Sequence, residues 1–272
     1  MPELPEVETV RKALLKNLKG KSIKSITVLH NNVFEKQDIG FVKKAIANQK
    51  INDILRRGKW LEFVLDDYYL LSHLRMEGKY VYRNIDDAIE KHQLVLFNIN
   101  DEFSLRYRDV RKFGKMYLVK KEELNNSPIS KLGLEPWDQK LDYIYLKEKY
   151  KKKTLPIKTV LLDQEIIVGI GNIYADEILF FSKINPYKKA KDLNEKELQS
   201  IIDNTKKVLE KAIEDGGTTI RSYTSEEGVE GRNQNNLKVH QRENERCYNC
   251  NSIIKKDKIG GRGTYYCPKC QK

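Results

Sequence analysis

Apolar residues recur at helical spacing near the start of the chain and again in its second half. One face of the first helix would carry Val7, Val10, Leu14 and Leu18. Because Gly20 stands where a C-terminal cap is expected, we predict a helix over residues 5–19 that buries this face. A later pattern can be capped by Asn194 and ended by Gly216, which predicts a second amphipathic helix.

Short β-rich or alternating runs fill the chain from the first helix to about residue 120. They are SIKSITVL, WLEFVLD, YYLLSHL, KYVY, QLVLFNI, FSLRY and KMYLV. Without helical patterns between them, these runs predict an antiparallel sandwich or barrel. Helical periodicity returns from about residue 140, and residues 216–246 are polar and Gly-rich enough to be a flexible loop. The predicted fold class is a multidomain α+β protein.

The charge of the chain suggests its partner. It has 51 Lys or Arg against 39 Asp or Glu, a net charge of +12, which favours a polyanion such as nucleic acid. A lysine-rich surface that serves only solubility would give the same count. No apolar run approaches the roughly 18 residues of a membrane span, so we expect no membrane partner. The opening MPELPEVETV is acidic and broken by prolines, unlike a secretory signal, so we expect a cytoplasmic protein.

All the cysteines fall near the C-terminus as two C-x-x-C pairs, Cys247 with Cys250 and Cys267 with Cys270. This spacing is typical of sites where four thiolates surround one ion, so we predict one structural Zn²⁺. The alternative, a pair of disulfides, would require an oxidising compartment. The residues between the pairs predict a β-hairpin with Arg262 at its tip, a basic element suited to gripping DNA.

A glycine-rich turn leads into the sequence NIYADEILF, which has a helical pattern. The free N–H groups at the start of such a helix, together with the side-chain amide of Asn172, could bind a phosphate. The simpler alternative is a tight turn between two packed helices. This motif alone leaves both open.

Several motifs follow one another over nearly the whole chain: PELPEVETV, RRGKWL, HLRMEGKY, DVRKFG, GIGNIYADEILF and the paired cysteines. As a set they resemble bacterial formamidopyrimidine-DNA glycosylases, which excise oxidised purines such as 8-oxoguanine and formamidopyrimidines and then cut the strand at the abasic site. The resemblance implies an N-terminal β-sandwich catalytic domain over 1–130, a helix-two-turn-helix DNA-binding domain over 131–225 and a zinc-finger domain over 238–272. It also implies a monomer that binds double-stranded DNA with damaged bases and is associated with the bacterial nucleoid.

The resemblance also assigns the chemistry. Removal of Met1 would leave Pro2 as a terminal secondary amine, and a pKa near roughly 8 would keep part of it unprotonated and nucleophilic. Attack at the sugar C1′ would release the base and give an iminium, or Schiff base, which promotes β,δ-elimination. By resemblance, Glu3 is the proton donor of the glycosylase step, Lys59 assists β-elimination and Arg262 assists δ-elimination.

An enzyme that extrudes a base must fill the space left behind. The family does so with a methionine, an arginine and a phenylalanine, which fall here on Met76, Arg111 and Phe113. Without the resemblance, Met76 and Phe113 would be assigned to the core. The implied phosphate contacts are His92, Asn172 and, within the run KKK, Lys153.

The chain departs from the family at several positions. It lacks the second histidine that often follows the one matching His92. The usual aromatic and Tyr-Gly positions before the zinc unit are Asn233 and the VHQR of residues 239–242. Two alternatives remain: the sister family of endonuclease VIII, whose usual opening has glycine in place of Leu4, and a zinc-containing DNA-binding protein without catalysis. The second leaves the N-terminal motif unexplained.

Overall fold

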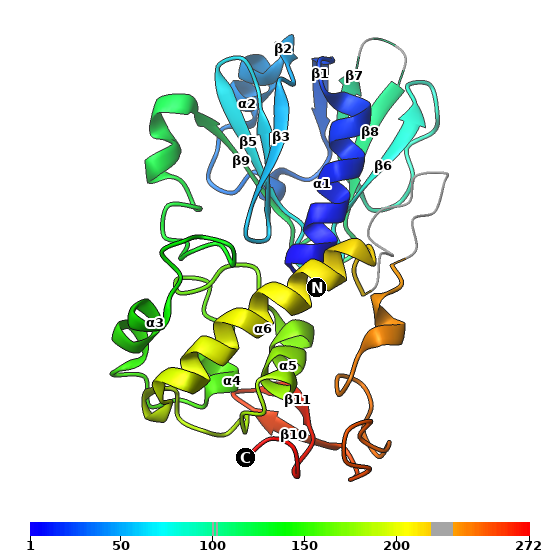
Figure 1. The fold of residues 1–272 in the computed structure, drawn as a ribbon. Helices are drawn as coiled ribbons and strands as arrows, with labels where there is room; N and C mark the ends of the chain where they lie inside the picture. The colour runs from blue at the N-terminus through cyan, green and yellow to red at the C-terminus, as the bar shows by residue number, and fades with distance from the viewer. Residues whose placement is uncertain (100, 102, 219–230) are drawn as a thin grey trace. The chain divides into compact units, whose positions relative to one another are not determined.

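A computed structural model describes residues 1–272 except 100, 102 and 219–230. Its contacts divide the chain into two compact units (Figure 1): residues 1–130 with 216–231, and residues 131–215 with 232–272. The first unit is built mainly of strands and the second mainly of helices. Within the described part of the chain, no helix is long and apolar enough to cross a membrane.

The first unit contains two antiparallel sheets, of strand order β2-β1-β7-β8-β6 and β3-β4-β5-β9. The strands are β1 Ser22–Val28, β2 Gln49–Lys50, β3 Asp53–Arg57, β4 Trp60–Val64, β5 Tyr68–His73, β6 Lys79–Asn84, β7 Gln93–Ile99, β8 Phe103–Arg108 and β9 Lys115–Lys120. Each β-rich run named above forms a strand, and the predicted sandwich is confirmed. Strands β2 and β3 are additional.

Side chains from both sheets fill one core. Ile54 and Phe63 come from the four-stranded sheet and Val95 from the five-stranded sheet, and all three are buried. The sheets are also joined by a polar contact, because the hydroxyl of Tyr80 on β6 donates to Oγ of Ser72 on β5 at 2.7 Å. Both residues are fully buried, so this bond satisfies groups that cannot reach water.

Helix α1 (Leu4–Leu18) packs its predicted apolar face into this core. The side chains on that face, none of which is exposed, are Val7, Val10, Leu14 and Leu18. Gly20 follows the helix with a φ of +83°, a conformation that glycine adopts most easily. The predicted helix is therefore confirmed, although its C-cap is Lys19, one residue before Gly20.

Helix α2 (Ile39–Ile46), which lies between β1 and β2, was not predicted. Asp38 caps it by accepting the N–H of Phe41 at 2.6 Å. Val42 and Ile46 bury the inner face against the sandwich. Two turns present too few apolar positions for a clear periodicity, so the pattern alone could not reveal this helix.

The second unit contains α3 (Tyr143–Tyr150), α4 (Ile157–Val160), α5 (Asn172–Phe181), α6 (Glu195–Glu214) and the hairpin of β10 (Lys255–Ile259) and β11 (Arg262–Tyr266). Helix α5 packs against both α6 and β11 (Figure 1). Asn194 caps α6 by accepting the N–H of Glu197 at 3.0 Å, and Gly216 follows the helix with a φ of +74°. The hairpin around Arg262 and the limits of α6 are as predicted.

The prediction of a flexible loop over 216–246 is wrong for its second half. Residues 232–246 include the short 3₁₀ helix η4 (Asn233–Asn236) and are tied to α5 because their backbone N–H groups donate to the carboxylate of Glu177. The guanidinium of Arg242 adds a bond to the carbonyl of Lys238 at 2.6 Å. The remaining part of the prediction, over 219–230, lies outside the described residues.

Candidate active site and DNA-contacting residues

The predicted nucleophile and the predicted acid stand immediately before α1, where the acid is the N-cap of the helix. Pro2 and Glu3 are both buried. The N–H of Glu3 donates to Oε2 of Glu6 at 2.8 Å, and Oε1 of Glu6 accepts the N–H of Thr218 at 2.8 Å. One buried carboxylate thus fixes both the start of the chain and the segment that follows α6.

Gly217 presses against this carboxylate with a φ of +86°, and a Cβ at this position would come within 2.8 Å of Oε1 of Glu6. A larger residue would displace the carboxylate as well as strain the backbone. The role of Glu6 was not predicted. Its signal was present, because a glutamate three residues after an N-cap is the spacing of a capping box.

Lys59 lies in the turn between β3 and β4, just after Gly58, and its residue is only 6 % exposed. The guanidinium of Arg56 donates to the carbonyl of Gly58 at 3.0 Å and to Oε2 of Glu8 at 3.0 Å. Because Glu8 belongs to α1, this ion pair ties the turn of Lys59 to the helix that begins beside Glu3.

The ion pairs of Glu8 lower the pKa of its carboxyl group. Burial alone would raise it, but hydrogen bonds from Arg11 and Arg56, together with their positive charges, lower the pKa below its ordinary value. The carboxylate therefore stays ionised at a lower pH than an ordinary glutamate, which favours the brace between α1 and the turn of Lys59.

His73 is an uncharged neighbour of Lys59, and it was not predicted. It pairs with Trp60 across β4 and β5, with the two ring centroids 4.8 Å apart. Burial, followed by the positive charges of Arg75 and Lys59, lowers the pKa of His73 to about 3. Its Nδ1 accepts the N–H of Arg75 at 3.0 Å, which also requires that nitrogen to be unprotonated.

The side chains predicted to fill the space of an extruded base lie in two turns, one between β5 and β6 and one between β8 and β9. Both turns contact Tyr107. Met76 is 38 % exposed and Phe113 is 49 % exposed, so assignment to the core is wrong for both. A Cβ on Gly78 would lie 2.3 Å from the hydroxyl oxygen of Tyr107, and one on Gly114 would lie 1.6 Å from it. Glycine therefore allows both turns to close on the same phenol.

Asp109 shapes the second of these turns from a fully buried position. Its carboxylate accepts the N–H of Arg111 at 3.0 Å and that of Gly114 at 2.8 Å. The guanidinium of Arg111 lies 4.7 Å from the ring centre of Phe113. The backbone N–H of Asp109 donates to the carbonyl of His92 at 3.0 Å. The structure thus brings Arg111, Phe113 and His92 onto one framework.

In the second unit, Asn172 begins α5 and its side-chain amide donates to the carbonyl of Gly263 on β11 at 2.9 Å. Gly263 follows Arg262, which is exposed at the start of that strand. The structure therefore links Asn172 to the backbone that carries Arg262. Lys153 is different, because its ammonium is paired with Asp163 at 3.1 Å.

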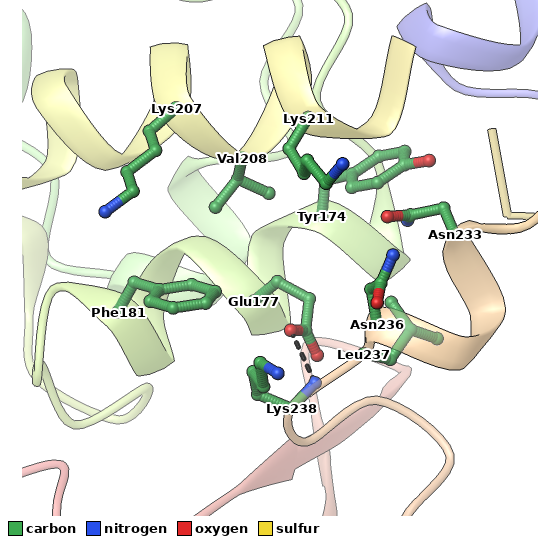
Figure 2. Close-up of a pocket in the computed structure, with 10 residues that line it drawn as sticks. All are labelled: Tyr174, Glu177, Phe181, Lys207, Val208, Lys211, Asn233, Asn236, Leu237 and Lys238. Atoms are coloured by element: carbon green, nitrogen blue, oxygen red, sulfur yellow. Dashed lines mark hydrogen bonds between the residues drawn. The ribbon is translucent and has the colours of Figure 1, made fainter. Parts of the chain in front are cut away.

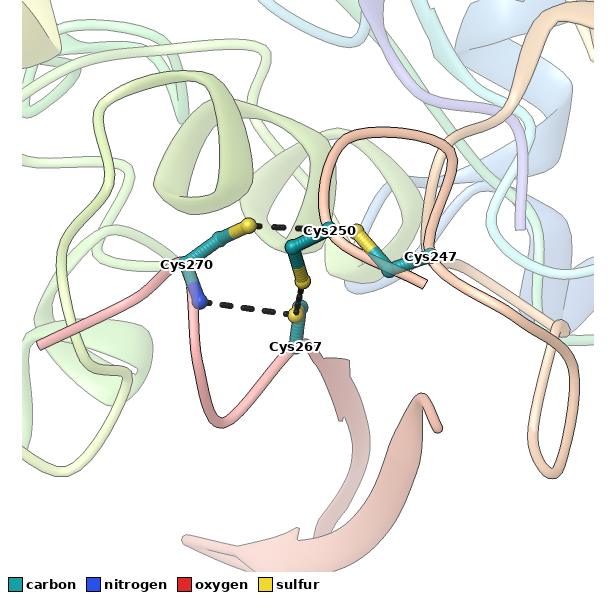
Figure 3. Close-up of side chains that lie close together, drawn as sticks. All are labelled: Cys247, Cys250, Cys267 and Cys270. Carbon is teal, nitrogen blue, oxygen red and sulfur yellow. Dashed lines mark hydrogen bonds between the residues drawn. The ribbon is translucent and has the colours of Figure 1, made fainter. Parts of the chain in front are cut away.

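The four cysteine sulfur atoms converge within 4.8 Å of one another (Figure 3). The sulfurs of Cys250 and Cys267 are 3.4 Å apart and those of Cys247 and Cys270 are 3.9 Å apart. A disulfide is only about 2.05 Å long, whereas zinc bonds of about 2.3 Å to four sulfurs place them about 3.8 Å apart. The site holds one structural zinc ion and leaves no ligand position for substrate.

A cavity of about 200 Å³ lies in the second unit between α5, α6 and η4 (Figure 2). Glu177 faces it and accepts the N–H of Lys238 at 2.8 Å and those of Val239 and His240 at 2.9 Å. Burial raises the pKa of Glu177, although these three donors oppose the rise. With both oxygens engaged, Glu177 holds the segment that leads to the zinc site. The cavity contains none of the predicted site residues.

Comparisons with known proteins cover the whole chain. A family model described as the formamidopyrimidine-DNA glycosylase N-terminal domain matches residues 1–116, and one described as the H2TH domain of the same enzymes matches residues 132–224. A zinc finger found in FPG and IleRS matches residues 244–272. The formamidopyrimidine-DNA glycosylases of Bacillus cereus (strain ATCC 14579) and Bacillus subtilis (strain 168) are each 44 % identical over 100 % of this chain and 99 % of their own length.

Solved structures give the same result. The complex of Lactococcus lactis Fpg with DNA that contains an abasic site is similar with a TM-score of 0.91 and 39 % identity over 99 % of both chains. A mutant of that protein in complex with Fapy-dG containing DNA has a TM-score of 0.93 over 100 % of both chains. The similarity includes the N-terminal sandwich, which the alternative of a non-catalytic zinc protein does not explain.

The zinc site should hold the shape of the hairpin and have no effect on the sandwich. Cys250→Ser should abolish zinc binding and the protection of β10 and β11 amides from hydrogen exchange, because so small a segment cannot keep a core without its metal. Lys258→Ala, which changes an exposed residue of β10, should keep both. Zinc analysis and exchange mass spectrometry check this, and a zinc-free variant with a protected hairpin would contradict it.

His73 should make the protein less stable in acid. Its folded pKa of about 3 lies below the ordinary 6.5, so stability falls as the pH drops from 6.5 towards 3, where only the unfolded chain binds the proton. The slope approaches about 1.4 kcal/mol per pH unit. His73→Gln should have a flatter profile in urea unfolding between pH 7 and pH 4. Parallel profiles for the two proteins would contradict this assignment.

Proposed function

Since the chain belongs to the formamidopyrimidine-DNA glycosylase family, and is therefore a DNA glycosylase for the repair of oxidised bases, we propose that it acts through the amine of Pro2. The observation that supports this most lies just before α1, where Pro2 and Glu3 are both buried and the N–H of Glu3 donates to Glu6. We propose oxidised purines, such as 8-oxoguanine and formamidopyrimidines, in double-stranded DNA as the substrates.

The first step is displacement of the damaged base. After removal of Met1, the secondary amine of Pro2 attacks C1′ of the sugar, and the bond from C1′ to the base breaks with its electron pair on the base. The attacking nitrogen gives up its proton to the departing base. The sugar ring then opens as Glu3 protonates the ring oxygen, and the nitrogen forms an iminium at C1′. A secondary amine suits this step because its iminium stays cationic without binding a proton.

The second step is cleavage of the strand. The iminium acidifies the hydrogen on C2′, and loss of that proton expels the 3′ phosphate by β-elimination. We assign assistance at this step to Lys59, whose turn is braced by Arg56 against Glu8. A further elimination expels the 5′ phosphate, and we assign its assistance to Arg262 at the hairpin tip. Both lysine and arginine place a cation near the leaving phosphate.

The DNA contacts follow the same division of the chain. In the first unit, Met76, Arg111 and Phe113 would occupy the space of the extruded base, and their exposure supports this. The proposed phosphate contacts are His92, Lys153 and Asn172. We further propose that residues 1–130, 131–225 and 238–272 act as the catalytic, DNA-binding and zinc-finger domains of a monomer.

Borohydride trapping tests the nucleophile. With an oligonucleotide containing 8-oxoguanine opposite cytosine, reduction should give a stable adduct of protein and DNA through Pro2, because borohydride reduces the iminium to an amine. Peptide mapping by mass spectrometry locates the adduct. Pro2→Ala still presents an α-amine and serves as the control, with a slower reaction expected from a primary amine. An adduct on a lysine, or strand cleavage with no adduct, would refute the assignment.

Loss of the void-filling side chains should matter most where a base has left. Phe113→Ala and Met76→Ala should each weaken binding to lesion-containing duplex by about 1 to 3 kcal/mol, as expected for base stacking, and weaken binding to undamaged duplex less. Fluorescence anisotropy on both duplexes measures this. Val110→Ala is a control, since Val110 is 48 % exposed close to the same turn. An equal loss on both duplexes would remove the support for a void-filling role.

A further inference from the structure

A buried charge network in the second unit is not used by the proposed chemistry. The ammonium of Lys158 donates to Oδ1 of Asp176 at 2.6 Å, and neither side chain has any exposed surface. The other carboxylate oxygen, Oδ2, lies 2.7 Å from Nδ1 of His240, which is also buried. Because an ionised carboxylate can only accept, Nδ1 carries the proton in this pair.

This network leads to the residues assigned to DNA contact. Lys158 also donates to the backbone carbonyl of Asn172 at 2.7 Å, so its ammonium holds the first residue of α5. Asn172 in turn donates to the carbonyl of Gly263, the residue after Arg262. A continuous chain of hydrogen bonds therefore runs from His240 through Asp176 and Lys158 to the strand of the hairpin.

His240 contacts the same strand directly. Its ring lies 4.9 Å from that of Tyr265 on β11, in an edge-on arrangement. Its backbone cannot move away, because Glu177 accepts the N–H of His240 at 2.9 Å.

We propose that His240, acting through Asp176, is a positioning residue that holds Asn172 and the strand of Arg262 in place for a DNA phosphate. A buried ionic group is costly unless each oxygen has a donor, so the loss of one donor forces the carboxylate to rearrange. A rearranged Asp176 would shift the ammonium of Lys158, and that ammonium also binds the carbonyl of Asn172 at the start of α5. The inference rests on the proposed function, because it takes Asn172 and Arg262 as phosphate contacts.

The test replaces His240 by asparagine or by leucine, two side chains that have the same shape as each other. Asparagine keeps an N–H donor near the position of Nδ1 of the histidine, whereas leucine has no donor. Binding to a duplex with an uncleavable tetrahydrofuran abasic analogue is measured over a range of salt concentrations. The slope of log affinity against log salt counts phosphate contacts, at about 0.9 per contact. The slope for His240→Leu should be smaller by about the value of one phosphate contact. The slope for His240→Asn should equal that of the wild type.

A slope change is not expected from a merely less stable protein, and zinc content with circular dichroism shows whether each variant is folded. If His240→Leu does not fold, Asp176→Asn is the second variant, since it keeps the shape and removes the charge, and it should lose the same contact. Unchanged slopes in the folded variants would overturn the positioning role alone. A wild-type protein that fails to bind the lesion duplex would overturn the proposed function instead.

Discussion

A single buried carboxylate holds the start of this chain. Chain ends ordinarily fray, and the proposed attack by the amine of Pro2 requires the start of the chain to be held in place. Glu6 provides this by accepting the N–H of Glu3 with one oxygen and that of Thr218 with the other. Burying a carboxylate is costly unless its oxygens are hydrogen-bonded, so these donors also make Glu6 tolerable in the core. The terminus and the segment after α6 consequently depend on the same group.

The sandwich of the first unit supplies rigidity, and its turns supply the proposed chemistry. Lys59, Met76, His92, Arg111 and Phe113 all lie outside the strands as these are defined. The turns of Met76 and Phe113 close on the buried Tyr107, and the second is also held by the buried Asp109. This is the usual arrangement of a binding site, in which loops carry function and the scaffold limits their motion. A side chain can then be exposed and still be well placed.

Local patterns were enough to predict much of this architecture. Helical periodicity and caps predicted α1 and α6, and alternation predicted most strands, because these features repeat within a few residues. The zinc site was equally local, since each C-x-x-C pair forms one turn. Residues such as Asp109, His73 and Asp176 escaped because their roles depend on partners brought close only by the fold. His240 and Asp176 are 64 residues apart in the chain, so no window of sequence contains the pair.

Two adjacent carboxylates on α5 show why a zinc ion alone does not fix the position of the hairpin. Successive residues on a helix point about 100° apart, so Asp176 and Glu177 reach different partners. Glu177 accepts hydrogen bonds from the backbone N–H groups of residues 238–240. Asp176 is hydrogen-bonded to the side chains of Lys158 and His240. The zinc ion fixes the internal shape of the hairpin, while these carboxylates fix where that hairpin sits on α5. The proposed contact of Arg262 with DNA depends on both constraints, because either one alone leaves the hairpin free to shift.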